Sequence, residues 1–246
     1  MKTRGFVERH PFWFVALLEA MVIAVYLVSG TVAHFRHLSN LQMYGLANLA
    51  LTVVVAFQLT RMSWWKVTGF RAARSPRDLL YFVVPLVPMV INWLPGIDLS
   101  SARHLFGVLA LTLMVGFVEE TVFRGLMITA LRSRGEWRAV LVPAVLFGLT
   151  HALNVLAGKS GTEAIAQVAY AMAIGFAFGA LLLHKGILWP LVLAHFLIDF
   201  AHFSQKPGFE PQPAWTMGIA VGMTVLFTGY GVWVMLERGA PDEARA

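Results

Sequence analysis

The sequence contains no cysteine, and its charged residues are few. Without cysteine, the chain cannot hold a disulfide framework, a thiolate zinc site or a cysteine nucleophile. Charged residues make up 13% of the 246 residues, against about 25% in soluble globular proteins. No run of basic residues interleaved with aromatics is present, so we expect no nucleic-acid partner. These absences indicate a chain that is surrounded by lipid rather than by water.

Long apolar runs fill most of the sequence, which is 58% hydrophobic and has a mean hydropathy of +0.70. A helix needs about 20 mostly apolar residues to cross a bilayer, and eight stretches approach this length. They are residues 11–33, 43–60, 79–95, 105–131, 139–157, 165–183, 188–203 and 214–236. We therefore predict an all-α fold. In this fold, residues 1–246 form a single integral membrane domain, a polytopic bundle of about eight transmembrane helices that encloses an intramembrane cavity.

The basic residues are divided unevenly between the two sides of these spans. Of the 19 Lys and Arg, 14 fall on the two termini and every second connection, and 4 fall on the other connections. Because cytoplasmic loops are enriched in Lys and Arg, we predict that both termini are cytoplasmic. Segment 61–78, on the same side, is too polar to span and is expected at the interface, with Trp64 and Trp65 at headgroup level. The short compact chain favours a prokaryotic plasma (inner) membrane.

Six ionisable residues form the main set at membrane depth, where such side chains are costly and usually face the bundle interior with a partner. They are Glu119, Glu120 and Arg124 in the fourth span, His151 in the fifth, and His195 and Asp199 in the seventh. At 1.5 Å per residue, Glu119 and His151 each lie roughly 18 Å from the cytoplasmic end of their helix, and His195 lies roughly 11 Å from it. We therefore expect these side chains to meet in one layer.

Helix spacing assigns partners within this set. Glu120 and Arg124 stand at i,i+4 on one helix face, and so do His195 and Asp199. We expect Glu120 and Arg124 to form an ion pair in the low dielectric of the bundle. Glu119 lies about 100° around the helix from Glu120, so its carboxylate stays available for chemistry.

The three groups also form ordered motifs. E-E-x-x-x-R begins at Glu119, F-x-x-x-H runs from Phe147 to His151, and H-x-x-x-[ND] runs from His195 to Asp199. In order and spacing they resemble the CAAX protease and bacteriocin-processing family, also called the Abi family, which includes the Ras-converting CAAX endoprotease. The resemblance covers about residues 105–200 as a catalytic core. It implies an intramembrane endopeptidase with a glutamate-dependent mechanism.

The resemblance also implies roles for the individual residues. Glu119 would be the general base, and His195 would help it to activate a water. His151 and Asp199 would stabilise the oxyanion. Eukaryotic members of the family tend to carry Asn at the position of Asp199. Because an ionised Asp cannot donate a hydrogen bond, this residue would have to be protonated or would instead orient His195. We expect four further residues to support the site: Glu120, Arg124, Phe147 and Asn154.

Other interpretations of the same residues stay open. Two Glu and two His match the composition of a zinc-dependent intramembrane protease, although no H-E-x-x-H is present and Arg124 disfavours a bound cation. Intramembrane Glu and His also form proton relays, so a non-enzymatic proton-coupled transporter or scaffold is a third interpretation. Glu19, in the first span, is expected to be a packing or interfacial residue. We expect no cofactor, with zinc as the alternative. The expected partners are membrane lipid and a peptide or lipidated protein substrate.

Overall fold

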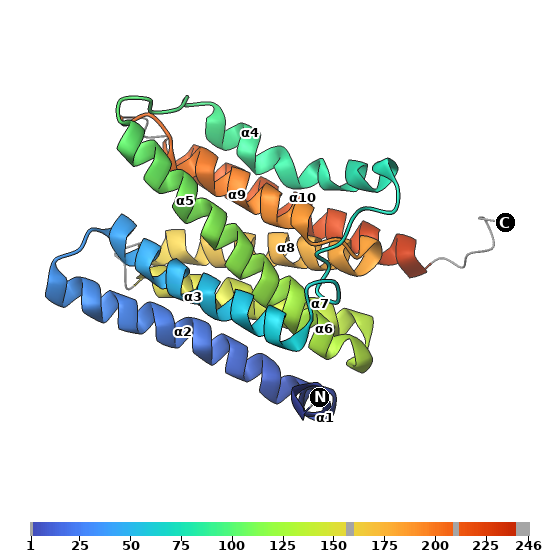
Figure 1. The fold of residues 1–246 in the computed structure, drawn as a ribbon. Helices are drawn as coiled ribbons and strands as arrows, with labels where there is room; N and C mark the ends of the chain where they lie inside the picture. Colours follow the sequence, from blue (N-terminus) through green and yellow to red (C-terminus); the bar gives the residue numbers. More distant parts are fainter. Residues whose placement is uncertain (1, 156–159, 209–211, 240–246) are drawn as a thin grey trace.

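The computed structural model describes residues 2–155, 160–208 and 212–239. In this part of the chain the helices lie side by side along a common direction, and the first and last helices have their chain ends at the same end of the bundle (Figure 1). The elements are α1 (Lys2–Arg9), α2 (Pro11–Arg36), α3 (Asn40–Met62), η1 (Pro76–Phe82), η2 (Val84–Leu86), α4 (Val87–Trp93), α5 (Ala102–Glu119), η3 (Glu120–Met127), α6 (Ile128–Leu131), η4 (Arg132–Arg134), α7 (Glu136–Thr150), η5 (His151–Val155), α8 (Gly161–Lys185), α9 (Trp189–Phe203) and α10 (Pro213–Gly239).

The apolar helices confirm the predicted fold class, an all-α polytopic membrane protein. Five helical stretches are long and apolar enough to cross a membrane: Pro11–Arg36, Asn40–Met62, Ala102–Arg134, Gly161–Lys185 and Ala214–Glu237. The stretches Val84–Trp93 and Trp189–Phe203 are apolar but shorter. Large apolar side chains such as Trp13, Phe57 and Phe106 are exposed on the helices, as expected where lipid replaces water.

The third predicted span, 79–95, is broken rather than one continuous helix. It consists of the 3₁₀ segments η1 and η2 followed by the single short helix α4. Pro85 and Pro88 lie within this stretch, and each proline removes a backbone donor and crowds the preceding turn. These prolines explain why the expected α-helix is interrupted.

The segment that follows α3 packs on the bundle. The Trp64 residue is only 3% exposed, and its ring lies edge to face with that of Phe14, with 6.3 Å between the centroids. Its expected depth at headgroup level stays a prediction. Further along, the Leu188 N–H donates to the Gly69 carbonyl at 2.8 Å. Arg71 Nε donates to the Gly186 carbonyl at 2.6 Å. These bonds hold the segment against the turn between α8 and α9.

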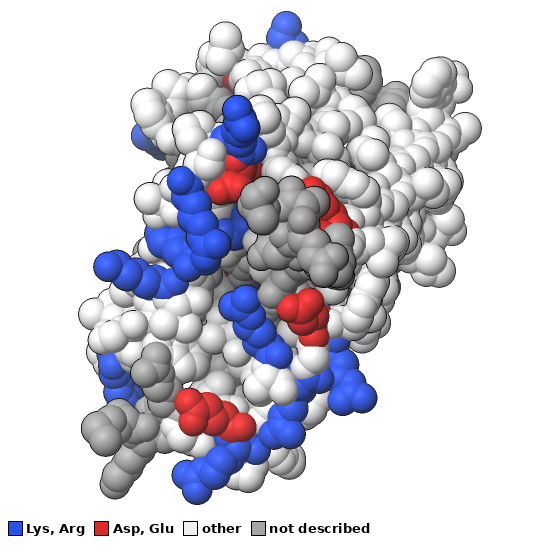
Figure 2. Space-filling view, turned by 90° about the vertical axis from the view of Figure 1, so that its right-hand side faces the viewer, with Lys and Arg blue, Asp and Glu red and all other residues white. Residues whose placement is uncertain are grey.

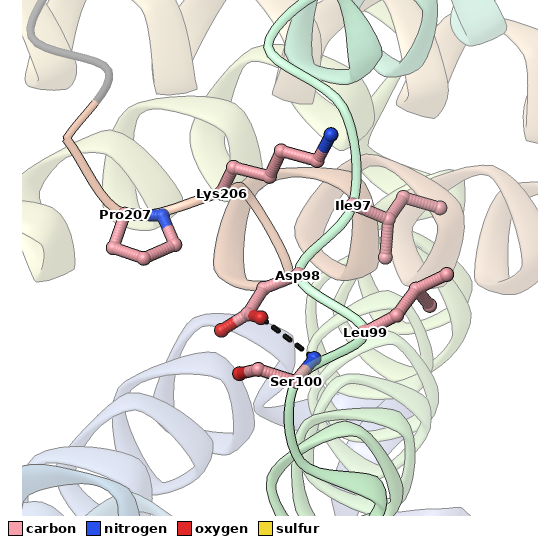
Figure 3. A pocket seen from close by; sticks show the side chains of 6 residues that line it. All are labelled: Ile97, Asp98, Leu99, Ser100, Lys206 and Pro207. Atoms are coloured by element: carbon pink, nitrogen blue, oxygen red, sulfur yellow. Dashed lines mark hydrogen bonds between the residues drawn. The ribbon is translucent and has the colours of Figure 1, made fainter.

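At the opposite end of the bundle, two loops hold the end of α9. The Asp98 N–H donates to the Ser204 carbonyl at 2.7 Å, and the Lys206 N–H donates to the Gly96 carbonyl at 3.1 Å. Beside this pairing lies an open hollow, shown in Figure 3, that Asp98 and Lys206 help to line. Hydrogen bonds from the hydroxyl and the N–H of Ser100 lower the pKa of Asp98. The pairing fixes the outer end of the helix that carries His195 and Asp199.

Candidate active site

The fourth span changes its helix type where the two glutamates stand. α5 ends at Glu119, and residues Glu120–Met127 form the π-helical stretch η3 before α6 resumes the α-helix. The span predicted at 105–131 is confirmed as the continuous apolar helical stretch Ala102–Arg134, but its middle is π-helical rather than α-helical. All eight residues of η3 are buried. A π-helical turn is rare and occurs often at functional sites. This one lies between α5 and α6 (Figure 1), and its apolar residues belong to the buried core.

Glu120 and Arg124 form the expected ion pair. Arg124 Nη1 lies 2.9 Å from Glu120 Oε1, and both side chains are almost fully buried. The guanidinium also lies over the ring of Phe147, 4.0 Å from its centroid, a favourable cation–π distance. A Cβ at Gly175 of α8 would come within 3.1 Å of Arg124 Nη2. The motif residue Phe147 thus supports the arginine from one side, and a glycine makes room for it on another.

The imidazole of His195 lies among three carboxylates. Its Nδ1 is 2.7 Å from Glu120 Oε1, and its Nε2 is 3.5 Å from Glu119 Oε2 and 3.5 Å from Asp199 Oδ2. A carboxylate accepts hydrogen bonds, so Nδ1–H donates to Glu120. The sequence predicted Arg124 as the partner of Glu120 and did not predict the contact between Glu120 and His195. Helix spacing predicts partners only on the same helix, such as the i,i+4 pair in the fourth span. A partner on another helix depends on how the helices pack.

His151 reaches the same region from the end of α7. Its Nδ1 lies 2.8 Å from the Phe147 carbonyl, which can only accept, so Nδ1 carries the proton. The ring of Phe147 is 4.7 Å from the His151 ring and 6.2 Å from the His195 ring, centroid to centroid. In the neutral imidazole, Nε2 is then an acceptor. An oxyanion donor at this position therefore requires a doubly protonated His151, a condition that the sequence-based interpretation did not include.

A comparison with known families covers these elements. Residues 101–201 match the family described as "Rce1-like: Type II CAAX prenyl endopeptidase Rce1-like". This stretch is similar to a CAAX protease domain, and it is called the CAAX protease domain after the family that it resembles. The match confirms the resemblance that the three motifs indicated, and the family is one of membrane endopeptidases. No curated protein and no solved structure matches the chain.

Two further residues are placed relative to the CAAX protease domain. Asn154, predicted as a supporting residue, has a side chain that lies outside the described residues. Glu19 lies in α2, before the domain begins, and its Oε1 accepts a hydrogen bond from Thr150 Oγ1 at 2.6 Å. Thr150 directly precedes His151. The first span therefore contacts the domain beside the histidine, and the sequence signal for this contact was one acidic residue within an apolar run.

The carboxylates of the CAAX protease domain are occupied by cationic and imidazole partners from the protein itself. Among the described residues, no group of three His, Cys, Asp or Glu side chains is arranged to hold a metal ion. His195 occupies the space between the carboxylates, with each of its nitrogens directed at one or more of them. The guanidinium of Arg124 adds a positive charge at Glu120 Oε1, the oxygen that His195 also contacts.

Proposed function

We propose that the protein is an intramembrane endopeptidase in which Glu119 activates a water for attack on a peptide bond. The observation that supports this most directly is the 3.5 Å separation between Glu119 Oε2 and His195 Nε2, on two helices of the CAAX protease domain. At this separation, one water molecule can contact both atoms. A carboxylate and an imidazole that share a water are the groups that general base catalysis requires.

The proposed reaction conserves protons and electrons. Glu119 takes a proton from the water while the water oxygen forms a bond to the carbonyl carbon. The carbonyl π pair moves to its oxygen and gives a tetrahedral oxyanion. When the oxyanion collapses, the C–N bond breaks, and the proton held by Glu119 passes to the leaving amine. The products are a carboxylic acid and an amine, and Glu119 returns to its ionised form. The acid then loses its proton to water and becomes a carboxylate.

The remaining residues have supporting roles in this proposal. Glu120 accepts from Nδ1–H of His195 and so directs Nε2 toward the water. Arg124 holds Glu120 in place through its 2.9 Å contact. Asp199 lies against the same His195 nitrogen as Glu119, a position that supports a role in orienting His195. Doubly protonated His151 would donate to the oxyanion.

The proposed substrate is a peptide or a lipidated protein that reaches the site from the membrane. The excess of basic residues at one end of the bundle supports cleavage near the cytoplasmic face of a prokaryotic plasma membrane. We further propose that the reaction needs no bound metal, because Arg124 shares the oxygen of Glu120 that a cation would use. Stoichiometric zinc in the purified protein, with activity lost on its removal and restored by its return, would contradict this.

The test is the substitution Glu119→Gln, which preserves the shape of the side chain and removes the base. Since general base catalysis contributes about 10²–10⁴-fold, we expect new protein termini in the membrane proteome to fall by at least about 100-fold relative to the wild type. The matched control is Glu136→Gln, the same change at an exposed position at the start of α7, which should leave cleavage unchanged. Equal cleavage by the wild type and a folded Glu119→Gln variant would refute the assignment.

A further inference from the structure

A hollow of about 290 Å³ lies at the end of the bundle where the chain begins. It is lined by the corner between α1 and α2 and by one residue of η4; these residues are Arg9, His10, Pro11, Phe12, Trp13 and Arg134. The corner forms because His10 leaves the helical conformation, with φ −130° and ψ 55°. None of the lining residues belongs to the carboxylate and imidazole cluster described above, so the hollow is a separate feature of the molecule.

The polar groups of the hollow favour an anion. Arg9 and Arg134 bring two guanidinium groups to it, and among the described residues no carboxylate lies within ion-pair distance of either. Arg9 Nε donates to the Gly5 carbonyl at 2.9 Å, which leaves its terminal nitrogens as donors. α2 begins here without a side-chain cap, and free N–H groups at the start of a helix attract negative charge. Guanidinium groups bind phosphate oxygens particularly well.

The apolar groups of the hollow indicate that the ligand has an apolar part in addition to its negative charge. Phe12 is 50% exposed and Trp13 is 69% exposed, and both lie in the first turn of a span that is long and apolar enough to cross the membrane. Aromatic residues at the end of a span lie at the membrane interface, where a headgroup meets acyl chains. A soluble anion would use the arginines and leave these two rings without a partner.

We propose that this hollow binds an anionic phospholipid, with the phosphate held by Arg9 and Arg134 and the acyl chains along Phe12 and Trp13. Basic residues gather on this end of the molecule, which faces the viewer in Figure 2. The cytoplasmic leaflet carries the anionic lipids that such residues attract. The bound lipid would join α1, α2 and η4, and so would fix the start of the first span against the end of the fourth.

The experiment uses the full chain in nanodiscs of phosphatidylcholine, with and without phosphatidylglycerol, at low salt. For the wild type we expect phosphatidylglycerol to raise the Tm by about 2–4 °C, the size of effect that one stabilising ligand has on a chain of this length. The variant Arg9→Gln/Arg134→Gln should lose most of this rise. Native mass spectrometry should find several-fold less retained phosphatidylglycerol on the variant than on the wild type.

The matched control is Arg132→Gln/Arg138→Gln, which removes the same charge from exposed positions near the hollow that do not line it. It should keep the full Tm rise, and an equal response of the two double variants would overturn the proposal. If the first double variant does not fold, Arg134→Gln alone carries the test, with about half of the rise lost. Inorganic phosphate in phosphatidylcholine nanodiscs should give no rise. A rise equal to that with phosphatidylglycerol would identify free phosphate as the occupant and overturn the assignment to lipid.

Discussion

At the scale of single residues, the two histidines differ in what their Nδ1 protons bind. His195 donates to the carboxylate of Glu120, whereas His151 donates to the backbone carbonyl of Phe147. A carboxylate partner stabilises an imidazolium that forms during catalysis. A backbone carbonyl fixes the ring and its tautomer but contributes no full charge. The same side chain is therefore suited to different tasks at the two positions.

The tautomer of His151 leads to a prediction about pH. Because Nδ1–H is bound to Phe147, Nε2 can donate to an oxyanion only when the ring is doubly protonated. We expect His151→Ala to lower kcat by about 100-fold or more, the usual effect of losing one oxyanion donor. His151→Asn should keep more activity, because an amide donates at any pH, and its rate should not decrease with rising pH through loss of the second proton of His151. Rate–pH profiles of the three proteins check this, and identical profiles for wild type and His151→Asn would contradict it.

Arg124 is the residue whose loss should affect stability most. It is 1% exposed, and Glu120 is fully buried, so Arg124→Met leaves a buried carboxylate without its cation. Removing one partner of a buried ion pair costs about 3–5 kcal/mol. Thermal or denaturant unfolding in detergent should show a large loss for Arg124→Met and a smaller loss for Arg124→Lys. Adding Glu120→Gln to Arg124→Met should recover part of the stability, and a purely additive double variant would show that the pair is not coupled.

At the scale of elements, the fourth span shows which features the sequence could predict. Its length, its apolar character and the i,i+4 pair at its centre were all visible in the sequence. The π-helical stretch Glu120–Met127 was not visible, because hydropathy is the same for both helix types. The breaks in the third span had a sequence signal, Pro85 and Pro88, but the length of the apolar run obscured it. Helix type depends on packing against neighbouring helices, and a single span does not contain that information.

The contact between α5 and α9 depends on one glycine. A Cβ at Gly116 would lie 2.9 Å from the Val192 carbonyl oxygen and 3.0 Å from the Phe196 nitrogen. Both are backbone atoms of α9 on either side of His195, and backbone cannot move aside as a flexible side chain can. Gly116→Ala should therefore push α9 away from α5 and lower the Tm by several degrees. It should also lower activity by about 100-fold, as a misplacement of about 1 Å does.

Gly107 offers the matched control on the same helix. A Cβ there would meet only the Leu41 side chain, at 3.6 Å, which is an ordinary contact. Alanine also favours a helix over glycine by about 0.8–1.0 kcal/mol, so Gly107→Ala should leave activity unchanged and leave stability unchanged or slightly higher. Thermal unfolding and a cleavage assay on both variants check the pair. Equal effects of the two substitutions would show that the α5–α9 contact does not position His195.

At the scale of the whole molecule, the site is assembled from spans that are far apart in the sequence. The motifs were readable because each lies on one helix with a fixed spacing, and the structure places Arg124, His151 and His195 beside the ring of Phe147. The contacts between helices were not readable: Glu120 to His195, Arg124 to the face of Phe147, and Thr150 to Glu19. These contacts depend on how the spans are rotated and shifted against one another. An intramembrane cavity around the site stays a prediction, and the two hollows described above lie at the ends of the bundle.

The distribution of charge along the bundle leads to a prediction about orientation. The start of α1 and the end of α10 share one end of the bundle (Figure 1), and the Lys and Arg side chains gather there (Figure 2). Because basic loops stay in the cytoplasm, we expect this end to be cytoplasmic. The absence of cysteine makes the test direct, since a single introduced cysteine is the only thiol. Ser133→Cys in η4 and Ser100→Cys at the opposite end are both exposed positions.

In intact cells, a membrane-impermeant maleimide should label Ser100→Cys at least about 10-fold faster than Ser133→Cys, and after permeabilisation both should react at similar rates. The reverse order would place the basic end outside. It would also move the proposed cleavage to the other face, because the carboxylates and histidines are fixed within the bundle and turn with it. Equal labelling in intact cells would mean that both orientations occur. The positive-inside rule predicts this outcome when the two ends of the bundle differ little in charge.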